Sequence, residues 1–256
     1  DALGRLDFLS HLLISGNKLT AIPKSLPNQL EIFDLRCNLV QTLTKYDFLG
    51  LQKLQVLLLS KNRITVVEDG AFGQLIALEV LDLSYNPIKS LSRTSFMGPR
   101  KLKEIYLVSL KELIPTQEPF SFPAPESAHL EILNMESSPI LATQLMEDVA
   151  ALTMFHELFD LNLNHCRLST LRSDLPRYLP RLHRLELTGN RLNCTNIVWL
   201  VKWLQALNIS MQDTGKFRRE IYNLKDICCK EATDAESFDE MTVICASPAY
   251  LSGKQI

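Results

Sequence analysis

Histidine and cysteine are the residues in this chain best able to bind a metal ion or to act as a nucleophile. The 256 residues include five histidines and six cysteines. The histidines are scattered, and none belongs to a His-Glu-x-x-His motif. The chain also contains no glycine-rich phosphate-binding loop and no Gly-x-Ser-x-Gly nucleophile elbow. The sequence therefore predicts no enzyme, no cofactor and no metal site, and the cysteines are the reactive groups that need an explanation.

A pattern of apolar and polar residues with fixed spacing occurs eight times, and the fold that it predicts would position these side chains. It consists of an apolar residue, apolar residues at +3 and +5, a polar residue (ideally Asn) at +8, and an apolar residue at +10. The copies start at Leu9, Leu30, Leu54, Leu78, Leu102, Leu130, Leu158 and Leu182. The starts lie 21 to 28 residues apart, which is the period of a leucine-rich repeat. Ordinary leucine-rich amphipathic helices are the alternative, but a register of 24 residues kept over three successive steps argues against them.

Each copy predicts a short strand followed by a turn. The residues at +3 and +5 share one face of the strand, because side chains alternate with a period of two. An amide at +8, such as that of Asn62, can bond backbone groups of the neighbouring turns. No single repeat can bury its apolar face alone, so the repeats must stack. We therefore expect an α/β fold over residues 1–192, a curved leucine-rich repeat solenoid with a parallel β-sheet on its concave face.

Charge and hydropathy exclude several classes of partner. The net charge is −2, which offers no general attraction for nucleic acid or for an anionic membrane. No run of 18 or more apolar residues occurs, so we expect contact with a membrane only through a segment outside this chain. No basic and then apolar leader precedes Asp1, so we expect any signal peptide to be already removed or absent.

The outward side chains of the strands, at +1, +2, +4, +6 and +7, are the expected binding surface. Nine of them are acidic and only four are basic, and this bias would steer a basic protein partner. The acidic ones are Glu31, Asp34, Glu79, Asp82, Glu104, Glu131, Glu136, Asp160 and Glu186. The candidate ligand-binding residues are Arg36, Lys61, Asp82, Tyr85, Glu104, Tyr106, Asn134, Glu136, Asn162, His165 and Arg184. Tyr85 and Tyr106 are the expected anchors, because aromatic residues dominate many interfaces; the alternative is a solvated face that only keeps the sheet soluble.

The middle of the chain departs from the regular spacing. Four prolines surround Phe120 and Phe122, at positions 115, 119, 123 and 125. This loop is either a second contact site or, as we favour, a tolerated insertion. Residues 143–155 have the apolar spacing of a helix, which we expect on the convex side.

The last quarter of the chain has a different pattern. Cys194 follows the final Asn-x-Leu, an apolar stripe with helical spacing includes Trp199 and Trp203, and the chain ends with a Cys-x-x-Pro motif at Cys245. This pattern resembles the cysteine-rich C-terminal flanking module of extracellular leucine-rich repeat proteins such as Toll-like receptors, Slit proteins and variable lymphocyte receptors. The resemblance implies that residues 193–256 form a disulfide-bonded cap over the apolar end of the solenoid.

One departure from that module concerns the cysteines. The module begins with Cys-x-Cys, whereas this chain has Asn196 at the second position and a Cys228-Cys229 doublet further on. The resemblance implies disulfides among Cys194, Cys228, Cys229 and Cys245, and which member of the doublet pairs with Cys194 stays open. A zinc site is the alternative, but the spacings do not fit Cys-x-x-Cys pairs and no histidine follows His183.

Two further cysteines lie in the repeats. Cys166 replaces the Asn at +8, so we expect it to be buried and inert. Cys37 lies at +7, about 24 Å from Cys166 at the spacing of parallel strands, which is too far for a disulfide. We favour a free thiol at Cys37. The alternatives are a disulfide to a missing N-terminal segment and a disulfide to another chain, which would give a dimer.

The function predicted is protein recognition outside the cell. Disulfide caps belong to oxidising compartments, and sequons at Asn193 and Asn208 predict N-glycosylation. The first interpretation is the ectodomain of a cell-surface receptor or adhesion protein that binds a protein ligand on its concave face. The alternatives are a freely secreted recognition protein of innate immunity and a non-catalytic regulatory or inhibitory subunit.

Overall fold

The computed structural model describes residues 5–116, 121–192, 199–200 and 202–203. Eight strands form one parallel sheet in the order β1-β2-β4-β6-β7-β8-β9-β10. They are β1 (His11–Leu13), β2 (Ile32–Asp34), β4 (Val56–Leu58), β6 (Val80–Asp82), β7 (Glu104–Tyr106), β8 (Ile132–Asn134), β9 (Asp160–Asn162) and β10 (Arg184–Glu186). Each strand covers positions +2 to +4 of one repeat, so the predicted solenoid is confirmed.

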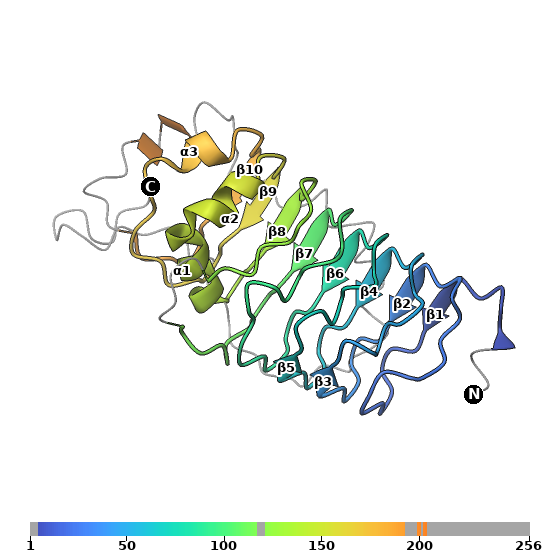
Figure 1. The fold of residues 1–256 in the computed structure, drawn as a ribbon. Coiled ribbons are helices and arrows are strands. Elements are labelled where there is room, and N and C mark those ends of the chain that lie inside the picture. Colours follow the sequence, from blue (N-terminus) through green and yellow to red (C-terminus); the bar gives the residue numbers. More distant parts are fainter. Residues whose placement is uncertain (1–4, 117–120, 193–198, 201, 204–256) are drawn as a thin grey trace.

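The strands pair without any shift of register. Leu12 pairs with Phe33, Phe33 with Leu57, and Leu57 with Leu81, so each +3 residue lies beside the next +3 residue. Figure 1 shows the strands side by side in chain order, in one elongated body. Each turn of the coil therefore presents the same repeat positions in straight rows along the sheet.

The rest of each turn is mostly irregular chain. β3 (Thr42–Leu43) and β5 (Val66–Val67) form a second, two-stranded parallel sheet, which lies across the coil from the first (Figure 1). The helix predicted over 143–155 is present as two helices, α1 (Pro139–Glu147) and α2 (Val149–Met154). They are separate because Asp148 leaves the helical conformation and its carboxylate accepts the Ala151 N–H at 2.9 Å, which caps α2. A short helix, α3 (Leu175–Tyr178), lies in the next repeat.

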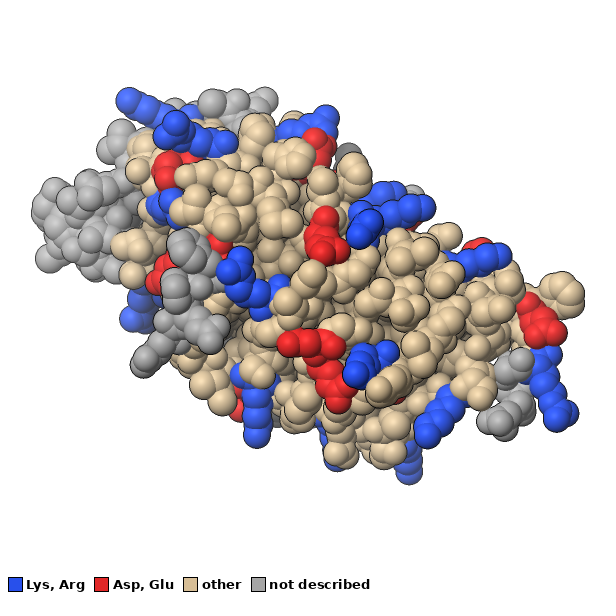
Figure 2. All heavy atoms as spheres, in the orientation of Figure 1, with Lys and Arg blue, Asp and Glu red and all other residues tan. Residues whose placement is uncertain are grey.

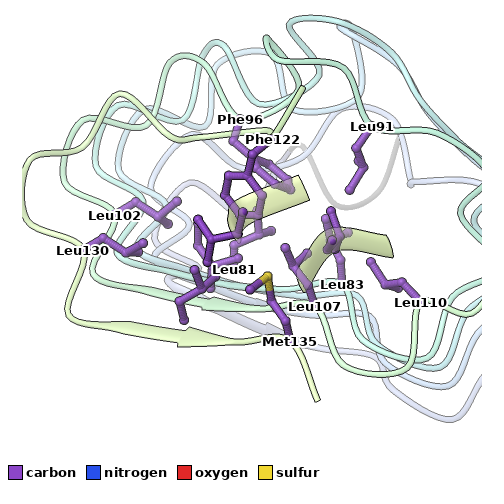
Figure 3. Packing of buried hydrophobic residues seen from close by; sticks show 14 of the residues in the cluster. Leu81, Leu83, Leu91, Phe96, Leu102, Leu107, Leu110, Phe122, Leu130 and Met135 are labelled. Atoms are coloured by element: carbon purple, nitrogen blue, oxygen red, sulfur yellow. The ribbon is translucent and has the colours of Figure 1, made fainter. Parts of the chain in front are cut away.

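The core consists of the leucines at the start, +3 and +5 of each repeat, which point toward one another inside the coil (Figure 3). A row of phenylalanines extends it: the Phe72 ring stacks 6.1 Å from the rings of both Phe48 and Phe96. Phe122 is 2% exposed and packs edge-on against Phe155 at 5.9 Å. Phe122, from the proline-rich loop, is therefore a core residue and no part of a second contact site, whereas Pro119 and Phe120 lie outside the described residues.

The predicted ladder of +8 asparagines is confirmed. The Asn62 side chain donates to the carbonyls of Leu35 and Leu59 at 2.9 and 3.0 Å, and its oxygen accepts the Val40 N–H at 3.1 Å. Each amide thus satisfies the backbone of its own turn and of the preceding one. Equivalent bonds are made by Asn38, Asn86 and Asn190.

Three repeats have other residues in this place, namely Leu110, Ser138 and Cys166. The Ser138 hydroxyl donates to the Leu107 carbonyl at 2.6 Å and accepts the Leu110 N–H at 2.9 Å. Cys166 is a free thiol, as predicted: it is 1% exposed, and burial raises its pKa to about 11.

Cys37 differs from the prediction. It is disulfide-bonded, so our preference for a free thiol is wrong; the residue is half-buried in the left-handed turn that follows β2. The predicted cap cysteines Cys194, Cys228, Cys229 and Cys245 lie outside the described residues, as do the sequons at Asn193 and Asn208. Within the described part of the chain, no helix has the length and apolarity that crossing a membrane requires.

Candidate functional site

The middle row of the sheet, at +4, is closed to a partner from β2 to β9, whereas Leu13 in β1 is exposed and Glu186 in β10 is half-buried. Asp82 and Tyr106 are each 8% exposed, Asn134 is 7% and Asn162 is 3% exposed. The expectation that these four candidates lie open on the sheet is therefore wrong. Their neighbours in the same row, Asp34 and Leu58, are buried as well.

The acidic and amide side chains in this row are buried because they bond the backbone. The strand ends at +4, so the N–H at +6 needs another acceptor. Asp82 accepts the Ser84 N–H at 2.9 Å, and Asn134 and Asn162 each accept the N–H two residues later at 3.0 and 2.9 Å. Asp34 does the same for Arg36 at 3.0 Å. These four side chains therefore hold the ends of their own strands, a structural role that the sequence analysis did not assign to them.

In the repeats where +4 is Tyr106 or Glu186, a side chain at +6 of the preceding repeat supplies the acceptor. The N–H of Val108 donates to the Ser84 hydroxyl at 3.1 Å, and that of Thr188 donates to the Asn164 side-chain oxygen at 2.7 Å. The polar residues of the sheet centre are thus linked from one strand to the next.

Tyr106 is held within the sheet in a similar way. Its hydroxyl donates to the Glu104 carboxylate at 2.7 Å. Burial raises the pKa of Glu104, the nearby carboxylate of Glu131 raises it further, and the hydrogen bond from Tyr106 acts in the opposite direction. Glu104 is half-buried, so it contributes more to the electrostatic potential at the surface than to direct contact with a partner.

The row at +7 is partly open, with Gly16, Lys61 and Tyr85 exposed and the others half-buried, and its backbone is left-handed in every repeat. The residues are Gly16, Cys37, Lys61, Tyr85, Ser109, Ser137, His165 and Gly189, with φ between 55° and 74°. This conformation turns the chain out of the strand and changes the direction of the side chain. Lys61 is exposed and its Nζ lies 5.9 Å from the centroid of the Tyr85 ring, which is 52% exposed. The predicted anchor Tyr85 therefore does face solvent, and His165 is half-buried in the same row. We call Lys61, Tyr85 and His165 the turn row.

The basic candidates of the sheet itself are held in ion pairs. Arg36 binds the Asp34 carboxylate through two nitrogens, at 3.0 and 2.7 Å, and its side chain is 12% exposed. Arg184 binds Asp160 at 3.0 Å. Glu136, two residues after the end of β8, is half-buried. These pairs neutralise both arginines, so they add little positive potential to the surface.

A further open row lies at +1, where the chain enters each strand. We call its members Glu79, Lys103, Glu131, Phe159 and His183 the rim row. They are direct neighbours, because each backbone N–H donates to the carbonyl of the preceding member at 2.8 Å. Phe159 is 39% exposed, and its ring stacks on that of His183 with 4.5 Å between centroids. Our list of binding candidates omitted this row. The sequence did contain a signal for it, because Phe159 is aromatic at +1, a position that is polar in every other repeat.

The rim row is acidic around Lys103. Its ammonium donates to the Glu79 carboxylate at 2.8 Å, and this hydrogen bond and charge pair raise the pKa of Lys103. Glu104 and Glu131 also act on Lys103, so three carboxylates surround one ammonium. In Figure 2, acidic and basic side chains on the visible face are otherwise interspersed among broad uncharged areas. The described residues contain no group of three or more His, Cys, Asp or Glu placed to hold a metal ion.

Comparison with known proteins agrees with this architecture. A model of the leucine rich repeat family matches residues 8–64 and 52–109. Mouse nephrocan is 27% identical over 197 residues, which cover 76% of this chain and 31% of nephrocan. This chain therefore spans about a third of the length of that relative.

Two solved structures share the fold. The Toll–Spatzle complex of Drosophila superposes with a TM-score of 0.59 and 23% identity, over 75% of this chain and 25% of that one. TLR13 bound to ssRNA13 superposes with a TM-score of 0.55 and 26% identity, over 66% of this chain and 23% of that one. The family match, the eight stacked repeats and the asparagine ladder lead to one conclusion: the described part of this chain is a leucine-rich repeat solenoid.

Proposed function

We propose that this protein is an extracellular recognition module that binds a basic protein partner through its rim row and turn row, without catalysis. The observation that carries the proposal is the division of the sheet into a closed centre and two open rows. A partner that lies across the strands would meet the rim row on one side and Tyr85 with Lys61 on the other.

The charge of the rim row supports a basic partner. Glu79 and Glu131 of the row, with Glu104 next to it in β7, outnumber Lys103, so the local potential is negative although the whole chain is nearly neutral. A potential of this kind raises the association rate of a positively charged partner. It also repels phosphate groups. We therefore favour a protein ligand over a nucleic acid, although TLR13, a protein of the same fold, has been solved with ssRNA13.

The setting of the module is part of the proposal. The resemblance of the C-terminal quarter to a disulfide-bonded cap and the two sequons favour an oxidising, extracellular environment. A receptor or adhesion ectodomain is our first choice, and a freely secreted recognition protein or a regulatory subunit is the second. Toll, a protein of the same fold, has been solved in a complex with Spatzle, which supports recognition of a partner molecule.

The test compares two double variants with equal loss of charge. Glu79→Gln/Glu131→Gln neutralises the rim row, and Glu112→Gln/Glu147→Gln neutralises two exposed acids away from the sheet. Glycosylated protein is used to capture partners from extracellular fluid, and the association rate of each captured partner is measured at low and physiological salt. We expect the rim-row variant to associate at least fivefold more slowly at low salt and the control to match the wild type. Equal rates for the two variants would contradict the proposal.

A further inference from the structure

The turns that follow the strands carry a strong excess of positive charge. Positions +7 to +11 of the eight repeats contain seven lysine and arginine residues and one acidic residue, Glu112. The whole chain, by contrast, has 27 basic and 29 acidic residues. The nearly neutral net charge therefore conceals two regions of opposite sign. The acidic rim row lies where the chain enters the strands, and a basic region lies on the turns where the chain leaves them.

Five of the seven basic residues occupy a single repeat position, +9. We call them the basic row: Lys18, Arg63, Lys111, Arg167 and Arg191. All five are exposed, and none forms an ion pair with an acidic group among the residues that the structure describes. The other two, at +7 and +11, flank this row and are exposed as well: Lys61 and Lys89.

The basic row is evenly spaced because the turns stack on one another. In all seven steps between repeats, the N–H at +7 donates to the carbonyl at +6 of the following repeat, at 2.7 to 3.0 Å. Next to the cations themselves, the N–H of Arg63 donates to the Val40 carbonyl at 2.9 Å. At about 4.8 Å per parallel strand, the first four cations follow one another at intervals of about 10 Å, and the whole row is about 34 Å long.

We propose that the basic row binds a linear sulfated polysaccharide. This site is separate from the rim row, and it shares only the extracellular setting with the proposed function. Sulfate groups recur along such a chain from one repeating unit to the next, so a single line of cations can bind them in succession. Arginine binds an oxyanion of this kind through two parallel hydrogen bonds, and lysine binds it as a point charge.

The composition of the row favours a polysaccharide over a nucleic acid. Sites for single-stranded nucleic acid combine basic side chains with several aromatic rings on which successive bases stack. The residues between the cations of the basic row are Leu39, Pro87 and Pro139, so the row itself has no aromatic ring. Beside it, the Tyr85 ring already has the Lys61 ammonium 5.9 Å from its centroid. A nucleic acid would therefore gain only its phosphate contacts at this surface.

The experiment measures the binding of labelled heparin fragments of increasing length to the whole glycosylated chain by fluorescence anisotropy. Affinity should rise with fragment length until the fragment spans the row of about 34 Å and should then level off, because each added unit meets a further cation. Desulfated heparin keeps the carboxylates of the chain but should bind at least tenfold more weakly. The affinity for heparin should also fall steeply with salt, because bound counter-ions are released from the polyanion.

A triple variant tests the row directly. Lys18→Gln/Arg63→Gln/Lys111→Gln removes three of its cations, all of them exposed. We expect this variant to bind heparin at least tenfold more weakly at about 150 mM salt, with a slope of log affinity against log salt that is smaller by about two. Its thermal unfolding should match that of the wild type, because exposed side chains without ion pairs contribute little to stability.

The matched control removes the same charge elsewhere. Lys24→Gln/Arg93→Gln/Lys101→Gln also replaces two lysines and one arginine, and these three are exposed outside positions +7 to +11. This variant should bind heparin within about twofold of the wild type. Equal losses in the two triple variants would overturn the basic row as a binding site.

The remaining outcomes identify the ligand and separate the two proposals. Undiminished binding of desulfated heparin would overturn the assignment to sulfate. Binding of a single-stranded oligonucleotide of equal charge, or of anionic vesicles, as tight as that of heparin would overturn the assignment to a polysaccharide. The Glu79→Gln/Glu131→Gln variant should bind heparin at least as tightly as the wild type does, so the rim-row proposal can fail while this one stands, and the reverse holds as well.

Discussion

The imidazole ring of His165 lies where a side chain at Gly189 would have to stand: a Cβ on Gly189 would be 2.1 Å from His165 Nδ1. Both residues occupy the +7 position of adjacent repeats, and both have a left-handed backbone, with φ of 55° and 74°. The glycine therefore does two things at once, since it accepts the turn of the backbone and leaves room for the ring of the preceding repeat.

The first prediction concerns this contact. Gly189→Ala should lower the free energy of unfolding by about 1–3 kcal/mol, because alanine is strained at this φ and its Cβ displaces the His165 ring. Gly50→Ala is the control: Gly50 has a φ of +83° but nothing within 4 Å of an added Cβ, so it reports the backbone strain alone. Urea unfolding measures both. A Gly189→Ala variant no less stable than Gly50→Ala would show that the ring moves aside without cost.

The asparagine ladder gives a second prediction. Asn62→Ala should cost roughly 1–3 kcal/mol, because it leaves the buried Val40 N–H without its acceptor and removes one of the two amide donors from the carbonyls of Leu35 and Leu59. Asn17→Ala, at the exposed first repeat, should cost about 0.5 kcal/mol or less, since water replaces its bonds. Chemical unfolding followed by circular dichroism provides the comparison, and similar losses for the two variants would contradict the ladder as a source of stability.

Substitutions of Tyr85 and Tyr106 should have different effects on stability and on partner binding. Tyr85→Ala is expected to leave the unfolding free energy within about 0.5 kcal/mol of the wild type and to weaken partner binding about tenfold, because Tyr85 is exposed. Tyr106→Ala should destabilise the protein by about 2–4 kcal/mol, because a buried ring and its bond to Glu104 are lost. Thermal unfolding and equilibrium binding are measured on both. Loss of binding only in a well-folded Tyr106→Ala protein would return the site to the sheet centre.

Asp174 gives a prediction about pH. Its hydrogen bond from Arg172 lowers its pKa from 3.8 to about 2. A lowered pKa in the folded state means that the pair stabilises the protein above the ordinary pKa of an aspartate and that this contribution disappears as the pH falls from about 4 to 2. The contribution is small, below about 1 kcal/mol, because both side chains are partly exposed. The stability difference between wild-type protein and Asp174→Asn should therefore be present at pH 6 and shrink below pH 4, and a constant difference would refute the assignment.

Cys166 should be unreactive in the folded protein. Burial and a pKa of about 11 keep the thiol neutral and out of reach of alkylating reagents at pH 8. We expect mass spectrometry to find no label on the peptide that contains Cys166 under native conditions and complete labelling in denaturant. Rapid native labelling would show that the seventh repeat opens locally.

The sequence by itself determined the parts of this protein that repeat. The spacing of leucines predicted eight parallel strands in one register, because apolar residues at +3 and +5 of a strand must share a buried face. The role of Asn62 and the burial of Cys166 followed from their place in the same unit. The apolar spacing also predicted the helical segment. It did not predict that the segment divides into two helices at Asp148, because that division depends on a cap formed by one side chain.

The tertiary structure decided which outward residues can meet a partner. The alternation of side chains along a strand predicts that Tyr106 and Tyr85 both point away from the core. It does not predict which groups accept hydrogen bonds from the backbone N–H groups beyond the end of the strand. Those groups draw Asp82, Asn134 and Asn162 into the sheet, whereas the left-handed turn at +7 sends Tyr85 outward. The stack of Phe159 on His183 likewise depends on the contact between successive turns of the coil, which lie 24 residues apart in the chain and side by side only once the solenoid has formed.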